Sequence, residues 1–234
     1  MAIPKIHTRD SCFAVDDYHQ GKDNNQLPIS LDVVIVGANP KLSKSWYKYE
    51  WSPERDTNLP DCYSFDGTKP SEYSNDPQND ICATCPQNAW GSKISPTGGK
   101  IKACSDQKRL AVTLADATDG TIYLLQVTPT SLKNLNLYQK DLLVRGIPPE
   151  IIRTKLSFDK ESNYPKLKFN FVGFNPTSAQ ANVDKLLGSN EVKIVTGELV
   201  VQDGHTQSTS ASSYGFTEEV GFTLTQYEQG GSHE

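Results

Sequence analysis

Four of the five cysteines lie in one stretch of the chain, spaced C-x19-C-x2-C-x18-C as Cys62, Cys82, Cys85 and Cys104. A Cys-x-x-Cys pair forms a tight turn whose two thiolates can take adjacent corners of a tetrahedron, and two more distant cysteines can complete it. The spacing therefore predicts one Zn²⁺ ion as a cofactor. Four protein ligands leave no coordination position for a substrate, so the expected zinc site is structural.

Other interpretations of these cysteines stay open. Disulfides are disfavoured because residues 1–10 lack the apolar stretch of a signal peptide, and we expect the protein to stay in a reducing cytoplasm. A redox pair at Cys82 and Cys85 lacks the surrounding βαβ pattern, and buried cysteines can simply be small apolar residues. Cys62 is the least constrained ligand, and His7, His19 or Cys12 are alternatives to it.

The segment around the cysteines, residues 52–108, is rich in Pro, Gly, Ser, Asn and Asp and has no apolar periodicity. A stretch of this length is unusual inside a compact domain unless something other than an apolar core orders it. The free energy of zinc binding can take that role. We therefore expect a zinc-ordered insertion here.

A second group of residues could bind nucleic acid. Residues 41–51 interleave three lysines with four aromatic residues. Bases stack on exposed rings while lysines hold phosphates, which is how single strands are bound without sequence preference. The alternation equally allows one aromatic face of a strand to lie in the core, and the sequence does not fix which face is exposed. The candidates are Lys44, Trp46, Tyr47, Lys48, Tyr49 and Trp51.

Further basic residues follow in the cysteine-rich segment and in a later hairpin. A solvated surface is the ordinary explanation for such charges. If the segments converge in space, they add to the same nucleic-acid surface. The candidates are Trp90, Lys93, Lys100, Lys102, Lys108, Arg109, Lys166 and Lys168.

The expected fold is mainly β. Alternating or β-branched runs predict strands, and a three- and four-residue leucine spacing predicts the main helix. An OB-like Greek-key barrel with the zinc loop as an insertion fits this order, and an α+β sandwich is the competitor. The expected strands are 31–36, 43–51, 110–114, 121–127, 151–159, 166–174 and 192–201, and the expected helices are 129–146 and 178–187.

Charge divides the chain into two parts. The net charge is −5, yet residues 197–234 hold six acidic residues and no Lys or Arg. The preceding residues are left with 23 basic and 22 acidic side chains, a net of +1. We expect an OB-like domain over residues 1–201, with the zinc-binding insertion at about 52–108, and an acidic, disordered tail over residues 202–234. No apolar run is long enough to span a membrane.

Catalytic signatures are missing from the sequence. It has no phosphate-binding glycine loop, no nucleophile elbow and no H-E-x-x-H motif. Asp116 and Asp119 could bind a metal, although aspartates in such a position are typical turn residues. We expect a protein that is not an enzyme, with a zinc- or magnesium-dependent nuclease as an alternative.

Three segments together resemble a known family. These are Cys82-Ala-Thr-Cys-Pro-Gln-Asn-Ala-Trp-Gly-Ser92, then Gly99-Lys-Ile-Lys-Ala-Cys-Ser-Asp-Gln-Lys-Arg-Leu110, and Thr128-Pro-Thr-Ser-Leu-Lys133 before a helix. Over residues 55–175 the chain resembles phage-encoded single-stranded DNA-binding proteins with a zinc-stabilised loop. The resemblance implies an OB-like core, a structural zinc held by Cys62, Cys82, Cys85 and Cys104, a role in DNA replication or recombination, and no catalytic residues.

The leading hypothesis is therefore a non-catalytic protein that holds single-stranded DNA. Its acidic tail would occupy the basic groove or recruit replication or recombination proteins, and we expect no membrane partner. The main alternative is a protein-interaction module whose zinc loop faces a replication or host protein. The expected location is the cytoplasm, which would be that of the host cell for a phage protein.

Overall fold

The structure is a computed structural model that describes residues 3–16, 28–49, 59–116, 119–202 and 205–208. Several sequence-based expectations concern residues outside these ranges. They include the side chains of Trp51 and His19 and most of the acidic tail. The predicted division into a domain and a tail is not tested by the described residues.

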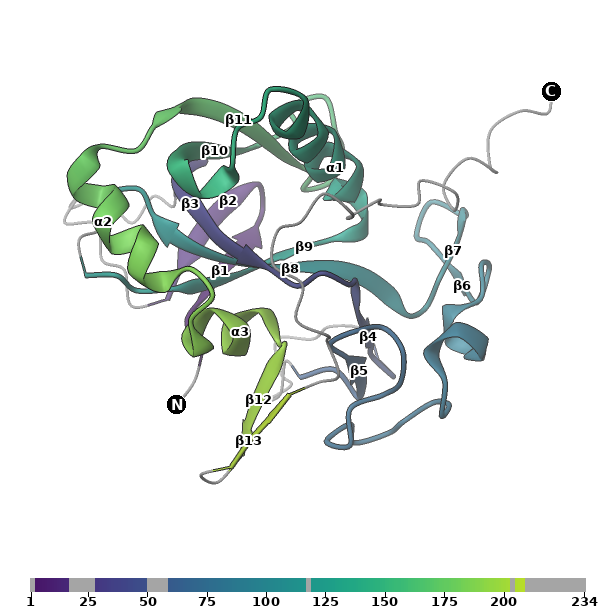
Figure 1. Ribbon diagram of the computed structural model, residues 1–234. Helices are drawn as coiled ribbons and strands as arrows, with labels where there is room; N and C mark the ends of the chain where they lie inside the picture. The colour runs from purple at the N-terminus through teal and green to yellow at the C-terminus, as the bar shows by residue number, and fades with distance from the viewer. Residues whose placement is uncertain (1–2, 17–27, 50–58, 117–118, 203–204, 209–234) are drawn as a thin grey trace.

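The centre of the molecule is a nine-stranded sheet that curls into a half barrel (Figure 1). Neighbouring strands are antiparallel, except that β1 runs parallel to β9. Register shifts in β3, between Ile35 and Gly37, and in β10, between Arg153 and Thr154, add the local bends that a curled sheet needs. The order across the main path is β11 (Leu167–Phe174), β10 (Ile152–Phe158), β3 (Ser30–Ala38), β8 (Ser105–Leu114), β9 (Tyr123–Val127), β1 (Lys5–Arg9) and β2 (Cys12–Val15).

One face of the sheet packs against helix α1 (Pro129–Val144). Proline at the first helical position has a suitable φ and lacks an N–H group that would be unpaired there anyway. The buried side of the helix contributes Leu132, Leu135, Tyr138 and Leu142 to the main apolar core. Inside this core, the hydroxyl of Tyr138 lies 2.8 Å from the hydroxyl of Thr154.

The opposite face is covered by two short helices, α2 (Thr177–Leu186) and α3 (Asn190–Thr196). Val192 and Val195 of α3 form a second core with sheet residues that include Ala111 and Leu124. The approach is close at Gly37, where an added Cβ would lie 2.3 Å from Val192 Cγ1. A glycine is therefore needed at this point of contact.

Between β3 and β8 the chain makes a long excursion with short elements. β4 (Ser43–Trp46) pairs with both β5 (Cys62–Ser64) and the start of β8. Two 3-10 turns follow, η1 (Cys82–Thr84) and η2 (Pro86–Asn88), and then the small ribbon of β6 (Lys93–Ile94) and β7 (Lys100–Ile101). The remaining elements are η3 (Pro149–Ile151), β12 (Leu199–Gln202) and β13 (His205–Ser208).

The mainly β class is confirmed, as are the strands 31–36, 110–114, 121–127, 151–159 and 166–174 and both helices, with small differences at their ends. The strand predicted over 43–51 stops at Trp46. The hairpin of β1 and β2 was not predicted, and its turn is made by Asp10 and Ser11 at positive φ. Among the described helices none is long and apolar enough to cross a membrane.

The strand predicted over residues 192–201 is wrong in its first half. Ser189 caps a helix there, because its hydroxyl accepts a hydrogen bond from the backbone N–H of Val192. Gly197 ends the helix at a φ of 84°, and only then does the extended segment β12 begin. The valines of this segment bury against the sheet as a helical face, so tertiary packing overrides their preference for strands.

The tail predicted to be disordered begins inside a described hairpin. β13 pairs with β12 in antiparallel register from Leu199 with Ser208 to Gln202 with His205. The first residues of the predicted tail therefore take part in a strand pair. The prediction of disorder for residues 209–234 lies outside the described residues.

Candidate metal centre and ligand surface

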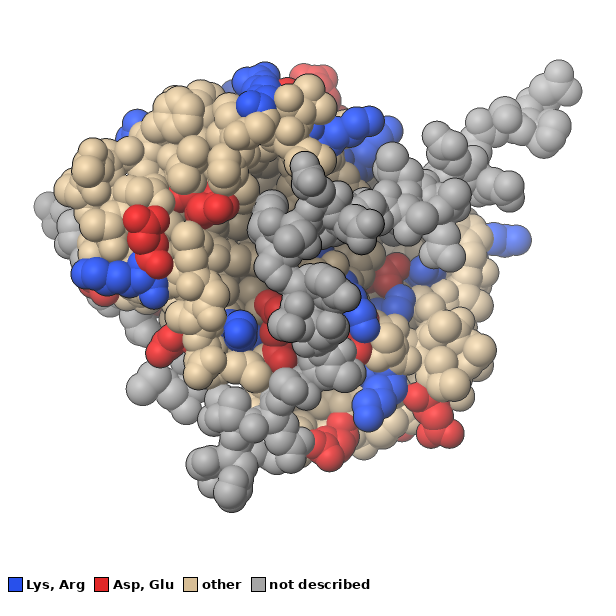
Figure 2. Space-filling view, in the orientation of Figure 1, with Lys and Arg blue, Asp and Glu red and all other residues tan. Residues whose placement is uncertain are grey.

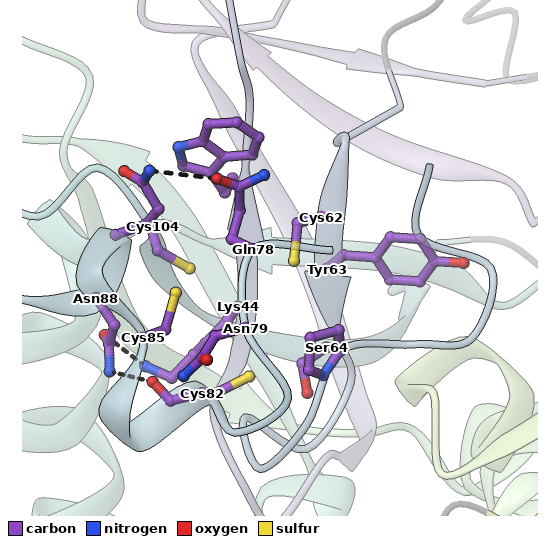
Figure 3. A pocket seen from close by; sticks show the side chains of 13 residues that line it. Lys44, Cys62, Tyr63, Ser64, Gln78, Asn79, Cys82, Cys85, Asn88 and Cys104 are labelled. Atoms are coloured by element: carbon purple, nitrogen blue, oxygen red, sulfur yellow. Dashed lines mark hydrogen bonds between the residues drawn. The ribbon is translucent and has the colours of Figure 1, made fainter. Parts of the chain in front are cut away.

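The four cysteines of the predicted zinc site line one pocket (Figure 3). Cys62, Cys82 and Cys104 are buried, Cys85 is partly buried, and all four are free thiols. In Figure 3 they come from different parts of the excursion and surround a common space. Residues more than 40 positions apart in the sequence therefore meet here. The same pocket is lined by Lys44, Trp46, Tyr63, Ser64, Pro70, Gln78, Asn79, Gln87 and Asn88.

The Cys-x-x-Cys pair is held by a tight turn. Cys82 opens η1, and the backbone N–H of Cys85 donates to the carbonyl of Cys82 over 3.3 Å. Pro86 then starts η2 directly after Cys85. The amide of Asn88 reaches back to the Cys82 carbonyl at 2.9 Å. This turn gives both thiols a fixed base from which they face the pocket.

The two distant cysteines are delivered by strands. Cys62 begins β5 and is the register partner of Trp46 in β4. Cys104 lies directly before β8, and its backbone N–H donates to the carbonyl of Gln87 at 2.8 Å. That bond ties the start of β8 to η2. Cys62 and Cys104 also pack with Trp46 in a small apolar cluster.

Electrostatics at the pocket favour neutral thiols when no cation is bound. Burial raises the pKa of the Cys104 thiol to about 12, and burial likewise raises the pKa of Cys82. The neighbouring cysteines add smaller contributions to both upward shifts of the pKa. As the side chains stand, no group of three or more His, Cys, Asp or Glu among the described residues is arranged to hold a metal ion.

A lysine lies beside the thiols. The ammonium of Lys44 donates to Oδ1 of Asn88 at 3.0 Å and forms a short ion pair with Asp106. Asp106 forms a second ion pair, with the ammonium of Lys102, at 3.0 Å. Both lysines hold the pKa of Asp106 below its usual range, although burial opposes them. Lys44 was predicted to contact DNA, but its side chain is only 12% exposed and is engaged inside the protein.

The predicted stacking residues divide into buried and exposed groups. Trp46 is 9% exposed and packs against Cys62 and Cys104, which contradicts a role as a surface ring. Tyr47, Tyr49 and Trp90 are 49%, 57% and 73% exposed. Trp90 thus has the most accessible ring of the three, and it lies in the loop between η2 and β6.

The expectation that Lys108 and Arg109 face a ligand is wrong. Burial lowers the pKa of Lys108 to about 8, and its ammonium donates to the carbonyl of Pro40 at 3.1 Å. Arg109 is also buried and donates to the carbonyls of Val195 and Thr196 at the end of α3, at 2.8 and 2.9 Å. These two basic residues are part of the interior of the fold.

The other basic candidates remain on the surface. Lys93 and Lys100 are exposed on the β6–β7 ribbon, and Lys102 is partly exposed. Lys48 forms an ion pair with Asp76 at 3.2 Å. Lys166 and Lys168 both face Asp159, at 3.6 and 2.8 Å. Figure 2 shows basic side chains in separate groups with acidic ones between them, rather than as one continuous stripe on this face.

Sequence reasoning missed one exposed aromatic ring near the basic candidates, that of Tyr164. Tyr164 lies in the turn between β10 and β11, is 53% exposed, and is close in sequence to Lys166. Its position in a polar turn was the available signal, since a tyrosine there has no core to enter. No arrangement of catalytic side chains stands out among the described residues; His7 pairs with Asp16 at 3.1 Å on the exposed N-terminal hairpin.

No protein-family model matches the chain, and no curated protein or solved structure is significantly similar to it. The site is therefore interpreted from its own geometry.

Proposed function

We propose that the protein is a non-catalytic single-stranded DNA-binding protein with an OB-like core and a structural zinc ion, acting in DNA replication or recombination. The observation that carries this proposal is the strand order. In the OB fold the first strand lies between the second and the fourth, the third lies beside the second, and the fifth lies beside the fourth. The order β11, β10, β3, β8, β9 follows that arrangement, with α1 between the third and fourth strands.

This correspondence suggests a function for two connections, one long and one short. OB folds bind oligonucleotides on the face of strands 2 and 3 and with the loops between strands 1 and 2 and between strands 4 and 5. Here the first of these loops is the cysteine-bearing excursion, and the second is the β10–β11 turn. The exposed rings of Trp90 and Tyr164 belong to these two loops. The surface lysines of both loops supply charge for the phosphates.

The face of strands 2 and 3 is covered in this protein. Ala111 of β8 and Leu124 of β9 are buried under α3, and Arg109 fixes the end of that helix. The proposed DNA contacts are therefore limited to the two loops and the start of β11. Of the residues expected from the sequence, Tyr47, Lys48, Tyr49, Trp90, Lys93, Lys100, Lys102, Lys166 and Lys168 stay in the proposal.

The zinc ion is proposed from the donor chemistry of the pocket. Thiolates at four positions form a common type of structural zinc site, and the apolar cluster at the pocket is small. That cluster consists of Trp46 and two of the cysteines with Ala103 packed against them. When bound, the ion would draw the four sulfurs together and fix the loop that carries Trp90.

Elemental analysis of the purified protein tests the metal directly, with one zinc per chain as the expected result. Chelation should make residues near 60–108 sensitive to protease while the sheet stays resistant. Protein without zinc, or unchanged protease resistance after chelation, would contradict the structural zinc.

Fluorescence anisotropy of a labelled oligothymidylate tests DNA binding. Affinity should fall steeply as salt rises, because released counterions drive binding to phosphates. Replacing Trp90 by Ala should weaken binding by about 5- to 150-fold, which corresponds to roughly 1–3 kcal/mol for one stacked base. Lys133→Ala on α1 is the matched surface control and should leave affinity unchanged. Affinity that does not depend on salt would refute the proposal.

A protein-interaction module is the second candidate, and an exposed apolar group on α1 favours it. Leu137, Leu143 and Val144 are 57%, 74% and 78% exposed. A module of that kind would not bind the oligothymidylate. Incubating labelled DNA with the protein and Mg²⁺ tests the nuclease alternative, for which we expect no cleavage.

A further inference from the structure

Lys44 is held in the cysteine pocket by three elements. It lies in β4, where it is the register partner of both Ser64 in β5 and Asp106 in β8. Its ammonium is fixed by Asn88 of η2 at 3.0 Å and by the carboxylate of Asp106. Figure 3 shows Lys44 beside Asn88 and Cys82, within the ring of residues that surround the thiols. A side chain with this many fixed partners has one defined position.

The local charges do not cancel. Asp106 is shared between Lys44 and Lys102, so two cations face one anion and a net charge of +1 remains. A Zn²⁺ ion with four thiolates carries a net charge of −2. A buried charge is costly unless an opposite charge is close to it. The excess positive charge beside the pocket and the negative charge of a four-thiolate centre are therefore complementary.

We propose that Lys44 is the charge-compensating residue of the zinc centre, with its ammonium held toward the thiolates by Asp106 and Asn88. This inference rests on the proposed structural zinc. Lys44 offsets the negative charge of the four-thiolate centre and raises the affinity of the site for zinc. Asn88 links Lys44 to the turn that carries Cys82, because its amide also donates to the carbonyl of Cys82 at 2.9 Å.

The position of Lys44 supports the assignment. Its side chain lines the same pocket as Cys82 and Cys104 and is only 12% exposed. Lys102 differs in this respect, because it is not among the residues that line the pocket and its side chain is 34% exposed. Two lysines bound to the same carboxylate thus have different environments, which provides a matched control.

The test is the zinc affinity of the full chain, measured by competition with a chromophoric chelator, for the wild type and three variants. Replacing an outer-shell partner of a metal site typically costs about 10- to 100-fold in affinity, and we expect that loss for Lys44→Met. Lys102→Met, which removes the other cation beside Asp106, should cost clearly less zinc affinity than Lys44→Met, because Lys102 does not line the pocket and its charge is partly screened by solvent. The cobalt-loaded forms should keep the thiolate charge-transfer band of a four-sulfur site.

Asp106→Asn separates charge compensation from a purely structural ion pair. The substitution removes a negative charge near the thiolates and leaves Asn88 to hold the ammonium of Lys44, so charge compensation predicts zinc affinity equal to or higher than that of the wild type. A structural role predicts a loss like that of Lys44→Met, because both variants break the same ion pair. If Lys44→Met does not fold, Asp106→Asn alone decides the question.

The outcomes are distinct for the two proposals. Wild-type protein that binds no zinc overturns the zinc centre and this inference with it. Wild-type protein that binds zinc, combined with unchanged affinity in Lys44→Met or weakened affinity in Asp106→Asn, overturns the role of Lys44 alone.

Discussion

Arg109→Lys should destabilise the protein strongly although the charge is conserved. The guanidinium donates from Nε to Thr196 and from Nη2 to Val195, and its centre lies 5.0 Å from the ring centroid of Phe65. A lysine can replace one of these donors but has no planar fork to span both carbonyls. The ammonium of a lysine, which is more strongly hydrated than a guanidinium, would also have to be buried. Burial at this site is already unfavourable for a cation, because it lowers the pKa of Arg109 to about 10.

The expected magnitude follows from the interactions that a lysine cannot make. A buried hydrogen bond to a charged group contributes about 1.5–3 kcal/mol, and a cation–π contact about 0.5–2 kcal/mol. Removing one of the hydrogen bonds and most of the ring contact should lower the free energy of unfolding by about 2–4 kcal/mol. For a chain of this size that corresponds to a decrease in Tm of roughly 5–15 °C.

Urea denaturation followed by far-UV circular dichroism measures this change. Arg145→Lys is the matched control, because Arg145 makes an exposed ion pair with Asp141 along α1 and should shift the free energy by less than about 0.5 kcal/mol. An Arg109→Lys variant as stable as the wild type would refute the role assigned to this clamp. Lower DNA affinity at unchanged stability would instead indicate that Arg109 contacts DNA, as the sequence had suggested.

Three further predictions concern buried groups. Because burial lowers the pKa of Lys108 from its usual 10.5 to about 8, the cost of its charge is present below pH 8 and is relieved as pH rises toward 10.5. The stability of the wild type relative to Lys108→Met, from urea titrations, should therefore rise by about 3 kcal/mol over this range. Gly197→Ala should lower Tm far more than Gly146→Ala, since both glycines have positive φ but only at Gly197 would a Cβ lie 2.6 Å from a ring carbon of Phe65. Tyr138→Phe should cost about 1–2 kcal/mol in the same urea assay, because a buried threonine hydroxyl loses its partner, and an unchanged midpoint would contradict this.

Local patterns in the sequence predicted most of the sheet. β8 and β9 are apolar runs joined by a turn-like segment, Lys166 and Lys168 alternate with apolar residues at the start of β11, and α1 has leucines at helical spacing with Gly146 after its end. Such signals need only neighbouring residues. The cysteine spacing predicted a zinc site, and the structure places Cys62 and Cys104 with the Cys82–Cys85 turn at one pocket, while the zinc itself stays a prediction.

Long-range partners could not be predicted. Lys108 and Arg109 look like surface charges in the sequence, and only the carbonyls at the end of α3, 86 and 87 positions away, explain why Arg109 is inside. The same helix was mistaken for a strand because its valines favour β structure until they pack on Ala111 and Leu124. Lys44 was misplaced for a related reason, because its partner Asp106 lies 62 residues further along the chain.

The excursion that carries the cysteines leaves and rejoins the sheet at one place. Ala38, at the end of β3, is the register partner of Leu110 in β8, so the chain departs and returns on adjacent strands. A short reverse turn could connect the same two strands without altering the order of the seven strands on the main path, although β4 would then be lost as a partner of β8. The thiol-bearing loop that follows β5 can accordingly change length and composition while the seven strands of the main path remain, whereas Phe65, which contacts Arg109, ties the first part of the excursion to the core.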